Sequence, residues 1–212
     1  MRKIICITIL FSVICGNIFS QNGKKLSESE KQVFEQKMIE ESKKITTLQC
    51  ILVLEKTSSQ VAEKTVMKGT MMYQSPSKLR LEFTDPAPST FILNGNNAVS
   101  LDKNGESTGN EKKLKQLGNF IIMMISGKGI TQQNKTFSSE FYELDDARIL
   151  IVLTPAQKHL KDLFYKIELR VDPKTMLSNE ITLDEKTGDK TIIFLKNKVL
   201  NTEIPQDKFS IK

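Results

Sequence analysis

Residues 69–105 decide the fold of this chain, and they read GTMMYQSPSKLRLEFTDPAPSTFILNGNNAVSLDKNG. Three short apolar runs are separated by proline-containing turns and by an Asn-Gly pair. In the run at 78–84, Leu79, Leu81 and Phe83 alternate with charged residues, which is the period of a half-buried β-strand. Asn94-Gly95 between two apolar runs indicates a tight β-hairpin. This segment therefore predicts an antiparallel meander.

The two-residue period extends beyond this segment in both directions. Residues 48–56 are apolar almost throughout, which predicts a strand covered on both faces, and 66–74 predict its neighbour. In the strand predicted over 163–173, Leu163, Tyr165, Ile167, Leu169 and Val171 share one face. The remaining predicted strands are 136–144, 147–155, a hairpin over 176–198 that turns at 187–189, and a final edge strand within 205–212. We therefore expect about eleven strands.

Two helices accompany these strands. Residues 22–48 predict the first, which begins with a capping box of Ser27 and Glu30. We expect this helix to pack through one apolar stripe, formed by Val33, Phe34, Met38 and Ile45.

The second helix is predicted over residues 110–129, and it interrupts the strands. Gly127 is a suitable stop for it. A helix in this position must pack on a face of the sheet or close its opening. Its apolar side chains recur at spacings of three and four residues, namely Leu114, Leu117, Ile121, Met124 and Ile125, with Phe120 widening the stripe.

The N-terminus has the pattern of a secretory signal peptide over residues 1–21. Arg2 and Lys3 precede an apolar run that is too short to be a permanent membrane anchor. Ile14 before Cys15 disfavours lipidation of that cysteine, because lipoprotein signals carry a small residue there. We expect an exported protein whose residues 22–212 form a single domain.

Charge and cysteine content limit the function further. The net charge is +6, from 31 basic and 25 acidic residues, and it falls to +4 without the signal. Such a dispersed excess suits an anionic surface or partner and argues against nucleic-acid binding. Cys50 is then the remaining cysteine, and its apolar neighbours favour a buried core residue over a nucleophile.

Few residues offer catalytic chemistry. His159, the single histidine, lies between two predicted strands and is expected in a solvated turn. Asp145-Asp146 and Asp184-Glu185 lack the spacing of a calcium loop and are interpreted as surface charge. We expect no enzyme, no metal site and no cofactor, although an active site built from distant carboxylates stays open.

Methionines are frequent in the predicted sheet and in the second helix. Methionine adapts to irregular apolar shapes, so it fills gaps in a core or lines a deformable site for acyl chains. A curved sheet that does not close has an apolar concave face, which a helix or a cargo must cover. The methionines concerned are Met67, Met71, Met72, Met123 and Met124.

The stretch quoted above resembles the diagnostic segment of LolA, the periplasmic carrier that moves lipoproteins from the inner to the outer membrane. The similarity extends over the whole mature chain, to Leu153–Pro155, 167–173 and 209–212. The residues that carry it are Gly69, Tyr73, Pro76, Arg80, Phe83, Pro86, Leu93, Asn94 and Gly95.

This resemblance implies an α+β fold, mainly antiparallel: an unclosed half β-barrel with an N-terminal helix and a helical lid over an apolar cavity. It implies acyl chains of lipoproteins as cargo, an inner-membrane ABC transporter as donor and an outer-membrane acceptor. We expect a monomer. The implied cavity lining is Leu52, Leu54, Met71, Tyr73, Leu79, Leu81, Phe83, Phe91 and Leu93, and the implied lid residues are Leu117, Phe120, Ile121, Met124 and Ile125.

One position departs from the family. Members of the family carry an arginine just before the motif proline, where it hydrogen-bonds to the lid, whereas this chain has Ser75. Three alternatives to a lipoprotein carrier stay open: a carrier of another amphiphile such as a glycolipid or pigment lipid, a cell-envelope hydrolase, and a structural envelope subunit. A cavity too small for one acyl chain would favour the structural subunit.

Overall fold

Twelve strands form one antiparallel sheet in the computed structural model, which describes residues 23–61, 63–127, 130 and 135–211. Their order is β1-β8-β9-β10-β11-β12-β2-β3-β4-β5-β6-β7, so the sheet ends at β1 and β7 and does not close. The strands are β1 (Gly23–Lys25), β2 (Thr47–Thr57), β3 (Lys64–Gln74), β4 (Lys78–Asp85), β5 (Ser89–Asn94), β6 (Asn97–Leu101), β7 (Ser107–Thr108), β8 (Phe137–Leu144), β9 (Ile149–Pro155), β10 (Phe164–Asp172), β11 (Leu177–Glu185) and β12 (Lys190–Leu200).

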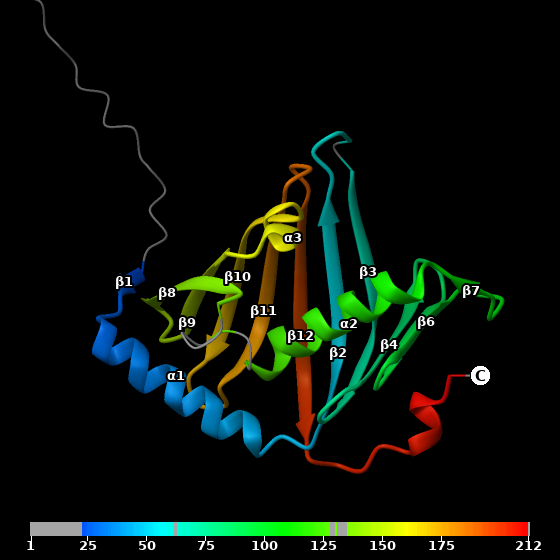
Figure 1. The fold of residues 1–212 in the computed structure, drawn as a ribbon, viewed down its shortest axis with the longest axis horizontal. Helices are drawn as coiled ribbons and strands as arrows, with labels where there is room; N and C mark the ends of the chain where they lie inside the picture. Colours follow the sequence, from blue (N-terminus) through cyan, green and yellow to red (C-terminus); the bar gives the residue numbers. More distant parts are fainter. Residues whose placement is uncertain (1–22, 62, 128–129, 131–134, 212) are drawn as a thin grey trace, which may run out of the picture.

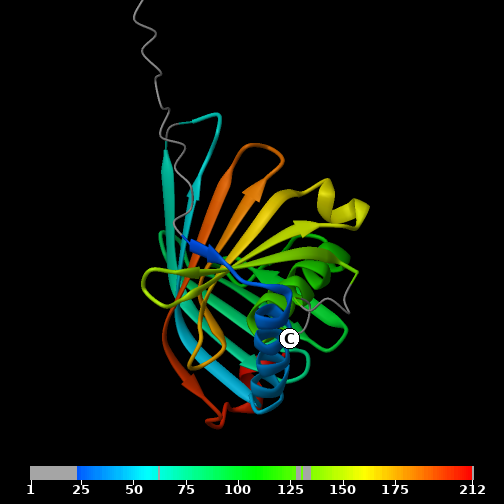
Figure 2. The same ribbon diagram turned by 90° about the vertical axis from the view of Figure 1, so that its left-hand side faces the viewer.

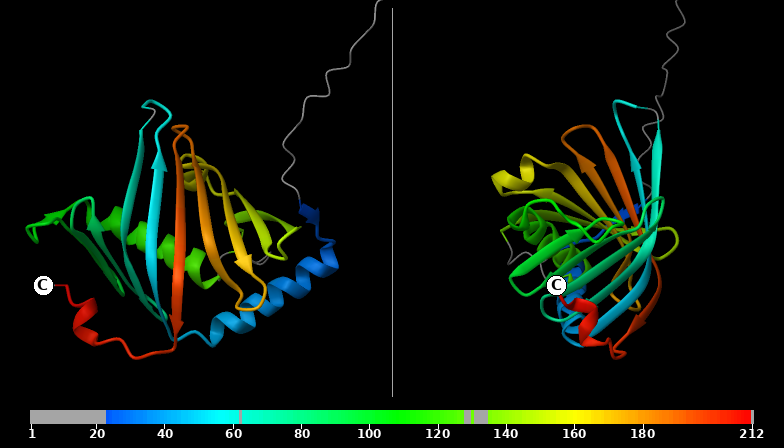
Figure 3. Two further views of the ribbon diagram at one scale, coloured as in Figure 1. Left: turned by 180° about the vertical axis from the view of Figure 1, so that it is seen from behind. Right: turned by 90° about the vertical axis from the view of Figure 1, so that its right-hand side faces the viewer.

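The sheet is curved, and its concave face carries the helices. Helix α2 (Glu111–Ser126) crosses this face, and α1 (Glu28–Lys43) runs along one end of it (Figure 1). Figures 2 and 3 show how the strands bend around α2. A one-turn helix, α3 (Lys158–Lys161), lies between β9 and β10. The main apolar core fills the space between the concave face and these helices.

Helix α1 begins as its sequence predicts, because Ser27 and Glu30 form the capping box. Its predicted stripe is partly wrong. Val33 is 70% exposed, and the helix instead buries Lys31, Glu35 and Met38. The Lys31 ammonium donates to the carbonyl of Ser139 in β8 (2.8 Å), so this buried charge has a hydrogen-bond partner on the sheet. Apolar contact along α1 comes from partly buried residues such as Phe34 and from Met38.

The predicted strands are confirmed except the one within 205–212, but burial differs in two of them. Ile51 of β2 is 42% exposed, so this strand is not covered on both faces. In β10 the predicted shared face of Ile167, Leu169 and Val171 is confirmed, but a register shift between Phe164 and Lys166 reverses the alternation at the start of the strand. Phe164 faces the core, while Leu163 and Tyr165 are exposed.

The chain ends differ from the predicted pattern. Short strands β1 and β7 add two strands at the edges and the predicted final strand is lost, which together give twelve strands instead of eleven. The predicted final strand is wrong, since residues Gln206–Phe209 form a 3-10 helix on the convex face. Arg80 and Asn94 donate to the carbonyls of Lys208 (2.9 Å) and Phe209 (3.1 Å), and this anchors the helix to β4 and β5.

Two sequence signals are explained locally. Gly127 ends α2 with φ +67°, as a helix stop requires. Gly69 sits at a register shift between β3 and β4, where a Cβ atom would lie 2.0 Å from the Glu82 carbonyl oxygen, so only glycine fits. The predicted signal peptide at residues 1–21 lies outside the described residues. None of the described helices is long and apolar enough to span a membrane.

Candidate functional site: an apolar cavity beneath α2

A small cavity of about 60 Å³ lies between α2 and the concave face of the sheet. Every side chain that lines it is apolar, so the cavity offers neither hydrogen-bond donors nor charges to a ligand. This chemistry suits a hydrocarbon and does not suit a polar substrate. The lining residues are Leu52, Leu54, Met71, Leu81, Phe83, Phe120, Ile121, Met124, Ile125, Ile181, Leu183, Ile193 and Leu195.

Cross-strand register brings these side chains to one face. Leu52 and Leu54 of β2 pair with Leu195 and Ile193 of β12. On the other side of β2, the row continues through Met71 in β3 and its partner Leu81 in β4. Because successive side chains of a strand alternate between faces, each strand contributes every second residue to the cavity.

Exposure of the lining shows on which side the cavity opens. Deep residues such as Leu52, Met71 and Leu195 are buried, whereas Leu54, Phe83, Phe120, Leu183 and Ile193 are only half-buried. The half-buried strand residues among them lie toward the end of the sheet that carries the β2–β3 and β11–β12 turns (Figure 1). We call this end the open rim.

Polar side chains replace the apolar ones immediately above the cavity. The Lys56 ammonium pairs with Glu185 (3.7 Å) and Asp189 (3.2 Å), and the Thr191 hydroxyl donates to Glu185 (2.9 Å). Along each of these strands, the side chains at the open rim therefore change from apolar to polar or charged within two residues. This arrangement matches an amphiphile whose polar end points outward.

Helix α2 is held on the sheet at distinct points along its length. At Gly118 a Cβ atom would lie 2.9 Å from the Phe91 ring and 3.0 Å from Leu93, so the helix backbone rests directly on β5. In the same half of the helix, the Lys115 ammonium donates to the Asn96 side chain (2.8 Å). Phe120 then stacks on Phe164 of β10.

The predicted lining residues all face the concave side, but not all reach the cavity. Leu52, Leu54, Met71, Leu81 and Phe83 line it. The other four are buried in the same core, and two of them support α2 at Gly118. These four are Tyr73, Leu79, Phe91 and Leu93.

Four of the five predicted lid residues also line the cavity: Phe120, Ile121, Met124 and Ile125. Leu117 does not, because it is 49% exposed. Of the methionines singled out, Met71 and Met124 belong to the lining.

Sequence reasoning missed the contribution of the β11–β12 hairpin. Ile181, Leu183, Ile193 and Leu195 form one wall of the cavity. The alternation of apolar residues along this hairpin was the signal available for them, although it does not by itself show that the hairpin faces α2.

Ser75 does not take the lid-bonding role that the family's arginine has, among the described residues. Its amide donates to the Thr46 carbonyl (2.8 Å), and no hydrogen bond between Ser75 and α2 occurs among the described residues. The helix is held here by apolar packing and by the Lys115–Asn96 hydrogen bond.

None of the residues singled out for catalytic potential lines the cavity. His159 is exposed on α3, Asp145 and Asp146 lie in the exposed β8–β9 turn, and Asp184 and Glu185 take part in ion pairs. Within the described part of the chain, no group of three metal-ligating side chains comes together. Cys50 is a free, buried thiol, and burial raises its pKa to about 12.

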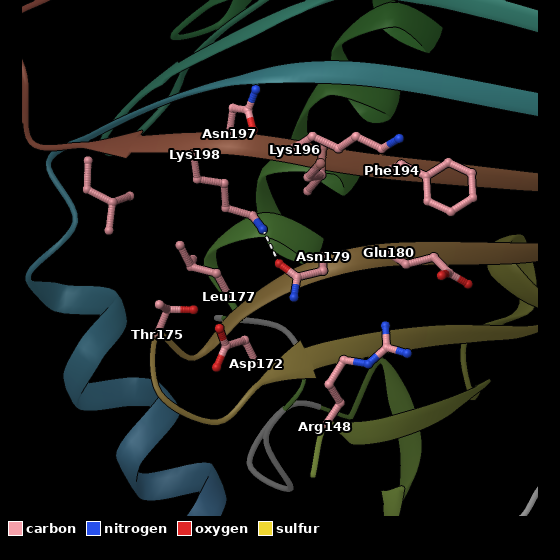
Figure 4. A pocket seen from close by; sticks show the side chains of 12 residues that line it. Arg148, Asp172, Thr175, Leu177, Asn179, Glu180, Phe194, Lys196, Asn197 and Lys198 are labelled. Atoms are coloured by element: carbon pink, nitrogen blue, oxygen red, sulfur yellow. Dashed lines mark hydrogen bonds between the residues drawn. The ribbon is translucent and has the colours of Figure 1, made fainter. Parts of the chain in front are cut away.

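A second, more polar groove of about 630 Å³ lies on the convex face, where β11 and β12 diverge (Figure 4). The Lys198 ammonium donates to the Asn179 side chain across this groove, and burial lowers the pKa of Lys198. Arg148 and Glu180 at its wall are engaged by Asp146 and Arg170. The charged side chains of Lys198, Arg148 and Glu180 thus have partners within the protein, and the groove is open to water.

Comparison with known proteins gives a family and a fold. The family model described as "Outer membrane lipoprotein carrier protein LolA" matches residues 43–212. An uncharacterized conserved protein from Thermus thermophilus is similar in structure, with a TM-score of 0.50, 10% identity, and coverage of 85% of this chain and 97% of that chain. A LolA superfamily protein from Nitrosomonas europaea is also similar, with a TM-score of 0.44, 11% identity, and coverage of 84% of this chain and 97% of that chain. No curated protein matches the chain.

Proposed function

Because this chain belongs to the family of the outer membrane lipoprotein carrier protein LolA, we propose that it is a non-enzymatic carrier of acyl chains. In this proposal it shields the lipid anchor of a lipoprotein between the inner and outer membranes. Each methylene of an anchor gains about 0.8 kcal/mol by leaving water, so an unshielded anchor does not cross an aqueous compartment. The observation that carries the proposal is the exclusively apolar cavity between α2 and the sheet.

Loading requires α2 to move. A single water needs about 10–15 Å³ of such space, so a cavity of about 60 Å³ has room for only a few methylenes. The contacts described above favour a movement in which the half of α2 near Lys115 and Gly118 stays on β5. The half that contains Phe120, Ile121 and Met124 then lifts toward the open rim and enlarges the cavity.

We further propose a periplasmic location reached through the signal peptide over 1–21, an ABC transporter in the inner membrane as donor and an acceptor in the outer membrane. These partners follow from the family, and the protein would exchange cargo with them as a monomer. The mild net charge of the mature chain is compatible with each of these partners.

One pair of neighbouring isoleucines tests the cavity directly. Ile193 lines it, whereas Ile192 lies on the opposite face of the same strand, and both are half-buried. We expect Ile193→Asp to weaken retention of a fluorescent fatty acid at least tenfold and Ile192→Asp to leave it nearly unchanged. Circular dichroism checks that both variants fold. Leu81→Asp provides a deeper, more disruptive test of the same cavity.

Retention that survives in folded Ile193→Asp and Leu81→Asp would contradict the assignment of the cavity. Mass spectrometry of material co-purified from the periplasm identifies the cargo. A lipoprotein supports the proposal, and a glycolipid or pigment lipid supports a carrier of another amphiphile.

The small volume of the cavity favours one competing function, a structural envelope subunit. Such a subunit needs no movement of α2 and binds no acyl chain. Failure of the wild-type protein to bind any acyl probe, with α2 protected against hydrogen exchange as strongly as the sheet, would favour that alternative.

A further inference from the structure

Two large apolar side chains are exposed next to each other at the start of β10. Leu163 is 55% exposed and Tyr165 is 57% exposed. They point outward because the register shift after Phe164 turns that residue into the core instead. Exposed apolar residues that stand singly need no explanation, but this pair lies within a cluster of cations.

Three lysines lie near the pair, two of them on the preceding helix and one against the Tyr165 ring. Lys158 and Lys161 are on α3, which directly precedes Leu163, and Lys186 lies in the β11–β12 turn. None of these three lysines forms an ion pair among the described residues. We call Leu163, Tyr165, Lys158, Lys161 and Lys186 the rim patch.

The acidic residues near the rim patch are largely engaged elsewhere. Glu185 and Asp189 pair with Lys56, and Asp184 pairs with Lys166 (3.5 Å) and Lys190 (3.3 Å). Asp162 is the exposed carboxylate nearest in sequence. The rim patch therefore keeps a positive excess at its surface.

Backbone contacts fix the geometry of the rim patch. The Lys186 amide donates to the Leu163 carbonyl (2.8 Å), and the Leu163 amide donates to the Leu160 carbonyl (3.0 Å). The Lys186 ammonium lies 3.5 Å from the centre of the Tyr165 ring. The apolar and cationic parts are thus presented together without any rearrangement of the backbone.

The rim patch lies at the open rim, beside the helix that covers the cavity. Figures 1 and 2 show α3 at the same end of the sheet as the β2–β3 and β11–β12 turns. Phe164, between Leu163 and Tyr165 in sequence, stacks on Phe120 of α2. A binding partner on the rim patch therefore contacts the residues on either side of Phe164, which itself supports α2.

We propose that the rim patch docks the protein on an anionic lipid bilayer, with Leu163 and Tyr165 in the interface and the three lysines against lipid head groups. An aliphatic and an aromatic side chain flanked by lysines is the composition that interfacial membrane sites use. A protein partner is less well suited, because a stable protein interface takes about 20–30 residues on each side. This inference rests on the proposed carrier function, since it places lipid exchange at the open rim.

The absence of tryptophan from the chain allows a direct test. Leu163→Trp introduces a single reporter into the rim patch, and Val33→Trp introduces a matched reporter at an exposed position on α1. Vesicles of phosphatidylcholine alone and of phosphatidylcholine with phosphatidylglycerol are added to each full-length mature protein. We expect a blue-shifted emission only for Leu163→Trp, only with anionic vesicles, and weaker at high salt.

Co-sedimentation with the same vesicles tests the side chains individually. We expect Leu163→Ser with Tyr165→Ser, and separately the three lysines changed to Gln, to lower binding at least fivefold. Val33→Ser and Lys103→Gln are exposed controls that we expect to leave it unchanged.

Fatty-acid binding in solution, measured on the same variants, separates this inference from the proposed function. The docking proposal is overturned if the wild-type protein does not bind anionic vesicles, or if the rim patch variants bind them as strongly as wild type. Either result counts even where fatty-acid binding is normal. Vesicle binding by a protein that takes up no fatty acid instead rejects the carrier function and leaves the docking surface.

Discussion

Phe120 of α2 and Phe164 of β10 stack with their ring centroids 5.5 Å apart and their planes 13° apart. This contact joins the helix over the cavity to the opposite wall of the sheet. We expect Phe164→Ala to lower the free energy of unfolding by about 1–3 kcal/mol, because it removes a partly buried ring and its stacking. It should also speed the association of a fluorescent fatty acid, since α2 is then less firmly held.

Urea denaturation and stopped-flow fluorescence measure these two effects. Tyr165→Ala is the matched control, because it removes an exposed aromatic ring from the next position. We expect that variant to stay within about 0.5 kcal/mol of wild type. An unchanged association rate in Phe164→Ala would mean that this stacking does not limit the movement of α2.

Gly118 allows α2 to rest on β5. We expect Gly118→Val to push the helix off Phe91 and Leu93 and to cost about 1–3 kcal/mol through overpacking. Asn119→Val places the same β-branched residue at an exposed neighbouring position of the helix. Thermal unfolding compares the two variants, and equal losses would show that helix propensity explains the effect without any contact to the sheet.

Arg80 links the family motif to the C-terminal segment. Its side chain is 17% exposed, and its guanidinium donates to the Lys208 carbonyl (2.9 Å) and pairs with Glu82. We expect Arg80→Met to cost about 1–3 kcal/mol, because hydrogen bonds of a charged group are lost, and to expose residues 204–209 to protease. Arg148→Met removes a more exposed ion pair and should cost about 0–1 kcal/mol. Resistance of the C-terminal segment in Arg80→Met would contradict this role.

The buried thiol of Cys50 makes stability depend on pH in the alkaline range. Burial raises its pKa from 9.0 to about 12 in the folded protein. Above pH 9 the unfolded chain therefore releases a proton that the folded chain keeps, so stability falls as pH rises from 9 toward 12. At pH 10 this costs about 1.4 kcal/mol relative to pH 8.

Comparison of wild type with Cys50→Ala isolates this contribution from other alkaline titrations. The stability difference between the two proteins should shift by about 1.4 kcal/mol against wild type between pH 8 and pH 10. Ellman's reagent should label the thiol only on unfolding. A constant difference, or fast labelling of the native protein, would show that the thiol is accessible.

Local signals in the sequence predicted most of the elements correctly. The Ser27–Glu30 capping box, the Asn94-Gly95 hairpin and the stop at Gly127 each depend on neighbours within a few residues, so the chain specifies them without its tertiary contacts. Period-two alternation likewise assigned Leu79, Leu81 and Phe83 to one face of β4. It did not show that only Leu81 and Phe83 of these reach the cavity, because that depends on where α2 crosses the sheet.

By itself, the sequence determined most of the secondary structure, the antiparallel order of the meander and the family resemblance, since all three are encoded in local spacing. Tertiary structure alone decided which side chains line the cavity and which meet water. Val33 is exposed because α1 turns Lys31, Glu35 and Met38 toward the sheet. Leu163 and Tyr165 are exposed because one register shift reverses the predicted faces at the start of β10, ahead of Ile167, and a shift in strand pairing has no signature in the spacing of apolar residues.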